Sequence, residues 1–417
     1  MRVLMLAPTP FFGDRGCHVR ILEEARALAP HGVEILVATY HVGRDVPGLS
    51  TVRTPRLPWI RRLPVGFSPH KPYLDALLLV TAVRAARAFR PDVLHGHLHE
   101  GAALAAVLAR LFRRPAVADL QGSLTGELID HRALPAGGPL PRLARAIERW
   151  IVRGPARLLA SSASFARELR ERWGGGDRVV TLPDGVDPDV FRPGLAVDDL
   201  RASLGLTGKR VVVFLGVLTA YQGVDDLLAA WPAVAGAVPD AHLLLMGYPN
   251  EDHYRARVAS AGLRDSVTVT GRIDYRDAPR HLALGDVAVS PKRSATEANG
   301  KLLNYMATGL PTVAYDGPVS REILGDAGAL VPIGDTAALA AACIELLDDA
   351  GERKRRGHAL RERAVAEFGW PALGRRLLDV DRDVARPRRR LAGGRRSLPR
   401  WRSWCSGSRS PSRSSPT

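Results

Sequence analysis

Residues 286–316 read DVAVSPKRSATEANGKLLNYMATGLPTVAYD. The apolar segments at the two ends, 287–290 and 311–314, have the length and composition of buried strands, and the residues between them predict a polar turn followed by a short helix. A strand, a turn, a helix and a second strand form one unit of a parallel α/β sheet. The helix begins in the run Glu-Ala-Asn-Gly-Lys, and we expect a ligand at that start.

The same alternation of strands and helices recurs on both sides of this stretch. In the first half we expect strands at 2–7, 33–39, 92–99, 115–120, 157–161 and 179–182. In the second half we expect further strands at 210–216, 242–246 and 267–270. The fold class is therefore α/β, with two Rossmann-like doubly wound domains, 1–193 and 194–370, that face a central cleft at the carboxyl ends of their strands.

Length and composition fit this organisation. A chain of 417 residues suits two domains of ordinary size, and 46% hydrophobic with 6% aromatic residues is a soluble globular composition. No apolar run reaches the roughly 18 residues that span a bilayer, and the N-terminus does not resemble a signal peptide. Three cysteines lie far apart, without metal-ligand spacing, which fits a cytoplasmic protein without disulfides.

The net charge of +16 is concentrated at one end. Residues 386–417 contain ten arginines and no acid, so they carry +10 and leave +6 for residues 1–385. This tail is expected to be disordered, and Trp401 and Trp404 within it leave RNA binding open as an alternative. The modest charge of the remainder favours phosphate ligands or peripheral contact with an anionic membrane surface, at its inner face, over nucleic acid.

The first loop, residues 8–16, resembles a dinucleotide-binding turn only superficially. Gly13 and Gly16 do not complete the Gly-x-Gly-x-x-Gly spacing, and the second strand ends in Thr-Tyr-His, without an acid to bind a ribose. NAD binding is therefore not expected. The two glycines either form a tight turn or leave the backbone bare for a ligand.

Three histidines alternate at the end of the fourth expected strand. His95, His97 and His99 would share one face of a strand that extends to residue 99. A metal site is one interpretation, but Glu100 is the only acid nearby in sequence, so a polar contact or a general acid/base facing the cleft is favoured. An ordinary buried histidine is the remaining alternative. After the next strand, Gln121 lies in a polar turn and is expected at the rim of the cleft.

Residues 43–72 contain six prolines and are expected to form a long connection. Trp59, Ile60, Leu63, Val65 and Phe67 lie among arginines there. They either dock on lipid headgroups or an acceptor, or pack on the domain.

The helix start at the centre of the quoted stretch allows two interpretations. Ser294 and Glu297 have the spacing of a capping box. Alternatively the helix begins at Asn299 or Gly300, so that its free N–H groups and Lys301 attract a diphosphate. Glu297 then suits a neutral sugar, and Asn304, one turn further on, suits ribose hydroxyls. Together these groups describe a nucleotide-sugar site.

At this point the chain resembles the retaining GT-B glycosyltransferases of family 4, across residues 1–385. Glu297 precedes the run Met306-Ala307-Thr308-Gly309-Leu310-Pro311, as the first Glu of the family's Glu-x7-Glu motif precedes Met-Ala-x-Gly-x-Pro. The other matches are the run Pro183-Asp184-Gly185-Val186-Asp187, the later Glu322, the segment DVLHGHLHEGAAL and Phe368-Gly369-Trp370. The resemblance also implies that the last helix, 371–385, crosses back onto the first domain.

The chain departs from the family at three positions. Val217 and Gln222 stand where many members have an Arg and a Lys for the diphosphate, and Asn304 stands seven residues after Glu297 in place of the second Glu. Lys301 resembles the Lys of a subset that reads Lys-Leu-x-Glu-Tyr-Met-Ala, and is expected to supply the missing charge.

The resemblance implies transfer of a sugar from an NDP-sugar to an acceptor hydroxyl of a glycan, lipid or small molecule, with retention, as in hexosyltransferases. It implies neither a metal nor another cofactor. A nucleotide-sugar binding protein with weak or no transferase activity, and a sugar-nucleotide epimerase, remain as alternatives. The expected site consists of His97 and Glu297 as catalytic residues, of Gly216, Gln222, Asn299, Gly300, Lys301, Leu302 and Asn304 at the donor, and of Gly13, Gly16, His95 and Gln121 at the acceptor side of the cleft.

Overall fold

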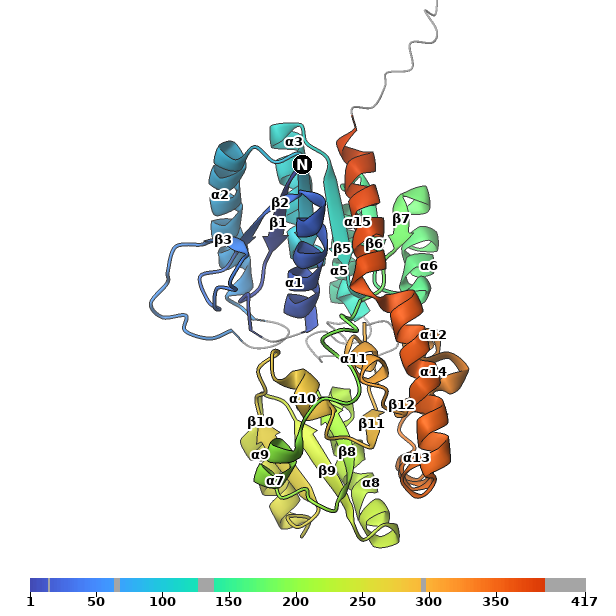
Figure 1. Ribbon diagram of the computed structural model, residues 1–417. Helices are drawn as coiled ribbons and strands as arrows, with labels where there is room; N and C mark the ends of the chain where they lie inside the picture. The colour runs from blue at the N-terminus through green and yellow to red at the C-terminus, as the bar shows by residue number, and fades with distance from the viewer. Residues whose placement is uncertain (14–15, 64–67, 127–138, 294–297, 387–417) are drawn as a thin grey trace, which may run out of the picture. The chain divides into compact units, whose positions relative to one another are not determined.

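The structure is a computed structural model that describes residues 1–13, 16–63, 68–126, 139–293 and 298–386 (Figure 1). Residues 1–385 form one compact unit, which contains two separate sheets, each with all of its strands parallel. Each sheet is covered by helices, because a parallel sheet built from buried apolar strands needs cover on both faces. This architecture confirms the predicted fold class.

The first sheet has the strand order β3-β2-β1-β4-β5-β6-β7. Its strands are β1 (Arg2–Ala7), β2 (Glu34–Thr39), β3 (Ser50–Arg53), β4 (Val93–His97), β5 (Ala116–Leu120), β6 (Arg157–Ala160) and β7 (Val179–Thr181). Its helices are α1 (Gly16–Leu28), α2 (Lys71–Phe89), α3 (Leu98–Phe112), α5 (Pro139–Arg153) and α6 (Ala163–Glu171). One apolar core joins the sheet to α1, and a second joins the other face to α2 and α3.

The second sheet has the order β10-β9-β8-β11-β12-β13, so its first strand is again central. Its strands are β8 (Arg210–Leu215), β9 (Ala241–Met246), β10 (Val267–Gly271), β11 (Val287–Ser290), β12 (Thr312–Tyr315) and β13 (Ala329–Val331). Its helices are α7 (Asp198–Ser203), α8 (Val224–Ala237), α9 (Glu251–Ser260), α10 (Ala278–Leu282), α11 (Lys301–Ala307), α12 (Pro318–Leu324), α13 (Thr336–Asp348) and α14 (Ala350–Phe368). Helices α8 and α13 share a core on one face, and α11, α12 and α14 share a core on the other.

The stretch 286–316 forms β11, α11 and β12, and the two strands are neighbours in the sheet. Helix α11 begins at Lys301 with Gly300 as its N-cap, which is the later of the two predicted starts. The capping-box residues Ser294 and Glu297 lie outside the described residues. Leu302, Leu303, Tyr305 and Met306 are buried in the core, whereas Lys301 and Asn304 are only half buried.

Strand β4 is shorter than predicted, and this corrects the placement of one histidine. The strand ends at His97, because Leu98 adopts a left-handed backbone conformation (φ 61°) and begins α3. His99 therefore lies on a helix, and only His95 and His97 share a strand face.

The connection 43–72 contains an edge strand, β3, that the sequence pattern did not predict. Ile60 and Leu63 are buried against the core of β1, β2 and α2, as the packing interpretation expects. Trp59 is 71% exposed, so this side chain does not pack on the core.

Helix α15 (Trp370–Ala385) follows the second half of the chain but packs against α1 of the first. Leu373, Leu377 and Leu378 lie in the same core as Ile21 and Leu22. Among the described residues, no helix combines the length and the apolar character that crossing a membrane requires.

Candidate active site

A cavity of ≈ 410 Å³ lies where the carboxyl ends of strands from both sheets meet. Residues that directly follow β1, β4 and β5 line it from the first half of the chain, and residues that follow β8, β9 and β11 line it from the second. This size lies in the usual range for small-molecule sites. Eight of the residues expected at the site line it: Gly16, Gln121, Gly216, Gln222, Asn299, Gly300, Lys301 and Asn304.

Lys301 is the central cation of the second-half wall. Its Nζ donates a hydrogen bond to Oε1 of Gln222 and lies 4.5 Å from the centroid of the Phe214 ring. Gly216 makes room for it, since a Cβ at position 216 would lie only 3.0 Å from Nζ. Gln222, the position at which the family resemblance leads us to expect a lysine, therefore orients Lys301 by a neutral contact.

Three other donor-side residues surround the start of α11. Asn299 donates from Nδ2 to Oγ of Ser290 (3.2 Å), which fixes its amide at the carboxyl end of β11. Gly300 faces Asp184, whose Oδ2 would lie 3.0 Å from a Cβ at position 300. Asn304 lines the cavity one turn after Gly300, as the helical spacing predicts.

One expected donor residue, Leu302, does not line the cavity, and the expected catalytic residue Glu297 is not among the described residues. Leu302 has no exposed surface and packs in the core, and its N–H already donates to the carbonyl of Asn299 (3.0 Å). The residue after Lys301 on a helix points about 100° away, which here means into the core. Glu297 lies outside the described residues, so its assignment stays a prediction.

Lys292 is a second cation that sequence reasoning missed. It follows β11, is 6% exposed and lines the cavity, where Nζ donates to the carbonyl of Ala298 (2.6 Å) and lies 5.7 Å from the Tyr221 ring centroid. Its position two residues beyond a buried strand was an available signal, because ligand contacts gather at the carboxyl ends of parallel strands.

The first-half wall contains an ion pair and a histidine. Lys71 pairs with Glu100, and both line the cavity. Burial favours the uncharged form of each side chain, but the attraction between the two charges outweighs the effect of burial. The pKa of Glu100 therefore lies below its usual value and the pKa of Lys71 lies above its usual value. His99 also lines the cavity, with Nε2 3.6 Å from Oε1 of Glu148.

Gln121 and Gly13 contact the second half of the chain. The carbonyl of Gln121 accepts a hydrogen bond from the N–H of Ala298 (3.1 Å), and the carbonyl of Gly13 accepts one from the hydroxyl of Tyr248. Gly13 also donates its N–H to Nδ1 of His18 (2.8 Å). Gly13 does not line the cavity, whereas Gly16, at the start of α1, does.

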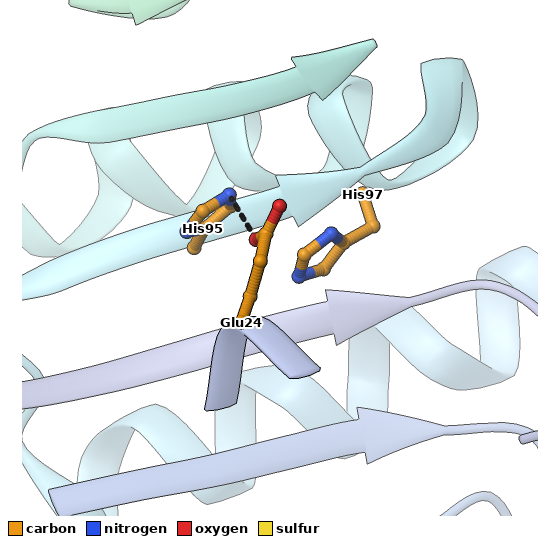
Figure 2. A group of neighbouring side chains, drawn as sticks. All are labelled: Glu24, His95 and His97. Atoms are coloured by element: carbon orange, nitrogen blue, oxygen red, sulfur yellow. Dashed lines mark ion pairs between the residues drawn. The ribbon is translucent and has the colours of Figure 1, made fainter. Parts of the chain in front are cut away.

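His95 and His97 are fully buried behind the cavity wall and do not line it. Figure 2 shows both rings on β4, with Glu24 reaching toward them from α1. Burial and the neighbouring His97 hold the pKa of His95 well below its usual value, so this ring is neutral. Its Nε2 lies 3.7 Å from Oε2 of Glu24.

The group Glu24, His95 and His97 offers ligand atoms within 4.8 Å of one another, but its geometry does not suit a shared metal ion. The two imidazole rings are stacked, with centroids 4.5 Å apart and 10° between the planes. A ring nitrogen binds a metal in the plane of its ring, at about 2.0–2.1 Å. Two stacked planes that are only 10° apart meet far beyond metal-ligand distance, so one ion cannot bind both rings as they stand.

Arg20 is the residue that connects this buried group to the cavity. Its guanidinium donates to both carboxylate oxygens of Asp119 (2.8 and 2.7 Å) and to Oδ1 of Asp184 (2.8 Å). Nδ1 of His97 lies 3.3 Å from the same Asp119. Burial alone would raise the pKa of Asp119, but Arg20 and His97 hold it well below its usual value. Arg20 and Asp184 line the cavity, so Asp119 and Arg20 connect His97 to the cavity wall.

The charges define what the cavity can bind. In the second half, the described residues that line it include two lysines and no acid. That wall suits a ligand with concentrated negative charge. The first-half wall combines paired charges with a histidine and a glutamine, which suits a neutral ligand with hydroxyl groups.

Two Rossmann-like sheets whose strand ends line one shared cavity are the arrangement of the GT-B fold. Residues 15–185 match the family model of the glycosyl transferase 4-like domain, and residues 209–349 match that of glycosyl transferases group 1. The chain belongs to glycosyltransferase family 4.

Similar proteins span almost the whole chain. The 2-deoxystreptamine N-acetyl-D-glucosaminyltransferase of Streptomyces fradiae is 30% identical over 89% of this chain and 91% of its own. The glycogen synthase of Mycobacterium tuberculosis is 27% identical over 96% and 100%. Among solved structures, Anabaena HepE in complex with UDP and glucose superposes with a TM-score of 0.73 at 18% identity, over 91% of this chain and 98% of that one. The protein is accordingly a glycosyltransferase.

Proposed function

We propose that the protein transfers a sugar from a nucleoside-diphosphate sugar to a hydroxyl group, with retention of configuration and without a metal ion. The observation that carries this proposal is the pair of lysines, Lys301 and Lys292, on the second-half wall. Among the described residues, that wall contains no acid. A diphosphate needs positive charge when it leaves, and two lysines supply it without the carboxylates that a bridging metal requires. A structural neighbour was solved with UDP and glucose, which supports a donor of this class.

We assign the remaining roles from the positions of the described residues, and the role of Glu297 from the family resemblance alone. Asn299 and Asn304 bind the nucleoside portion, Gln222 holds Lys301, and Glu297 binds the donor sugar. His99 and Gln121 face the acceptor. His97 does not contact substrate in this proposal and instead orients Arg20 through Asp119.

The first test replaces the central cation. Lys301→Ala should lower kcat/KM for the donor by about 10- to 100-fold, the range expected when a hydrogen bond to a charged group is lost. Lys354→Ala, at an exposed position of α14, is the matched control and should leave the rate unchanged. The donor is chosen beforehand by screening UDP-, GDP- and ADP-sugars for thermal stabilisation.

Three results would contradict the proposal. Equal rates for Lys301→Ala and Lys354→Ala would show that the charge of Lys301 does not stabilise the leaving diphosphate. A product whose anomeric configuration is inverted, as seen by NMR, or activity that disappears with a chelator, would exclude the retaining, metal-independent reaction.

A further inference from the structure

Helix α5 presents an apolar stripe to solvent. Its exposed large side chains are Leu140 (54% exposed), Leu143 (58%), Ile147 (46%) and Trp150 (50%). They recur three, four and three residues apart, so they form one continuous line along the helix. A single exposed apolar residue needs no explanation, but four in line on one helix indicate a binding surface.

The stripe is separate from the face by which α5 packs on the protein. Pro141, Ala144, Ile151 and Val152 are buried, and Ile151 and Val152 share a core with β5, β6 and α6. The helix therefore has one apolar face that packs in the fold and a second one that the described residues leave exposed.

A row of arginines lies beside the stripe. Arg142, Arg145, Arg149 and Arg153 are all exposed, and the only acid of the helix, Glu148, is fully buried. The outward surface of α5 thus carries four positive charges and no negative one.

We propose that α5 docks in the plane of an anionic lipid bilayer. Leucine, isoleucine and tryptophan enter the boundary between headgroups and acyl chains, and the arginine row meets the lipid phosphates, each arginine adding to the attraction. A second copy of the chain fits worse, because a symmetric contact would bring one arginine row against another. A nucleic acid would meet the arginines but leave the apolar stripe without a partner.

The buried face of the same helix reaches the cavity wall. The carboxylate of Glu148 accepts hydrogen bonds from the N–H of Leu124 (3.1 Å) and from the N–H of Thr125 (3.1 Å), and it lies beside His99. Leu124 and His99 line the cavity. Docking through α5 therefore holds the first-half wall next to the lipid surface, where an acceptor with a lipid anchor would be presented; this extension rests on the proposed function, whereas the docking does not.

The test is co-sedimentation of the full chain with vesicles. Wild type should bind vesicles of phosphatidylcholine mixed with phosphatidylglycerol, and bind vesicles of phosphatidylcholine alone more weakly. The double variant Leu143→Asp with Ile147→Asp should lose at least about tenfold in binding. Arg145→Gln with Arg149→Gln should lose about fivefold for each arginine, and much of the preference for the anionic lipid. Val365→Asp, at an exposed position of α14, is the matched control and should bind as wild type does.

Three outcomes would overturn the proposal. The first is that the wild type stays in the supernatant with anionic vesicles. The second is that the aspartate variant binds as well as the wild type, which would assign the binding to another basic segment such as residues 386–417. The third is that Val365→Asp loses as much vesicle binding as the α5 variants. Circular dichroism melts identify any variant that fails to fold. If the aspartate variant does not fold, the vesicle binding of the arginine variant decides whether α5 is the docking surface. Donor-induced thermal stabilisation, measured without lipid, reports on the proposed function separately.

Discussion

Gly216 and Lys301 show how one missing side chain positions a charge. Gly216→Ala should displace the amine of Lys301, because the new Cβ would lie 3.0 Å from Nζ, closer than ordinary contact. The amine is the flexible end of its side chain, so the protein should fold normally, and donor affinity should fall by about three- to tenfold through partial loss of a charged contact. Isothermal titration with the donor measures the effect.

Gly236→Ala is the matched control for this substitution. Gly236 lies in α8 with nothing within 4 Å of its Cβ position, so alanine there should leave donor affinity unchanged and slightly stabilise the helix. Unchanged affinity in Gly216→Ala would mean that Lys301 does not contact the donor from its present position.

At the residue scale, sequence reasoning placed residues in the cavity where a local periodicity determined the direction of the side chain. Lys301 and Asn304 lie on one helical face, and both line the cavity. Leu302 does not, because its direction is set by the apolar core that α11 packs against. Arg20 was missed because its partners, Asp119 and Asp184, are 99 and 164 residues away in sequence.

At the scale of elements, α15 carries a carboxyl group that makes its packing depend on pH. Asp381 is fully buried against the first half, both of its oxygens lack a hydrogen-bond partner among the described residues, and burial raises its pKa to about 8. An acid whose pKa is higher in the folded state binds a proton there that the unfolded chain has released. The contribution of Asp381 to stability therefore falls as pH rises from about 4 to about 8.

Asp381→Asn removes this titration and keeps the shape of the side chain. Its Tm should be close to that of wild type at pH 5 and higher by at least about 2 °C at pH 8.5, since about 1 kcal/mol shifts the Tm of a large domain by roughly that amount. Asp379→Asn, at an exposed position of the same helix, should show no such trend. A constant difference between wild type and Asp381→Asn from pH 5 to pH 8.5 would contradict the assignment.

Most strands could be predicted because they are buried on both faces and therefore appear in the sequence as short apolar runs. Strands β1, β2, β5, β8 and β9 lie within one or two residues of their predicted positions. β3 was missed because an edge strand with the sequence STVR, none of it fully buried, has no such signal. β4 was extended too far because the left-handed turn at Leu98 cannot be recognised from an alternating histidine pattern.

At the scale of the whole molecule, a carboxylate of the second half holds a helix of the first. Glu322 on α12 accepts hydrogen bonds from the N–H of Ala163 at both oxygens (2.7 and 2.9 Å) and from the N–H of Ser164 (3.5 Å). These N–H groups open α6, so the carboxylate also meets the positive end of the helix dipole. The family resemblance marked Glu322 without indicating this contact, because a bridge across 159 residues of sequence depends on the assembled fold.

Glu322→Ala should release this contact between the halves. The amides of Ala163 and Ser164 should then exchange hydrogen faster. The amide of Phe165 should stay protected, because it donates its hydrogen bond to the side chain of Ser162 and not to Glu322. The loss of a charged cap should lower the free energy of unfolding by about 0.5–2 kcal/mol. Because both halves line the cavity, kcat/KM should fall as well, since the catalytic arrangement needs the two walls held together.

Glu322→Gln retains an acceptor but no charge and should give an intermediate result. Equal exchange at Ala163 in wild type and Glu322→Ala would show that the contact does not persist in solution, and the two halves would then be held by their other hydrogen bonds, such as that from Ala298 to Gln121.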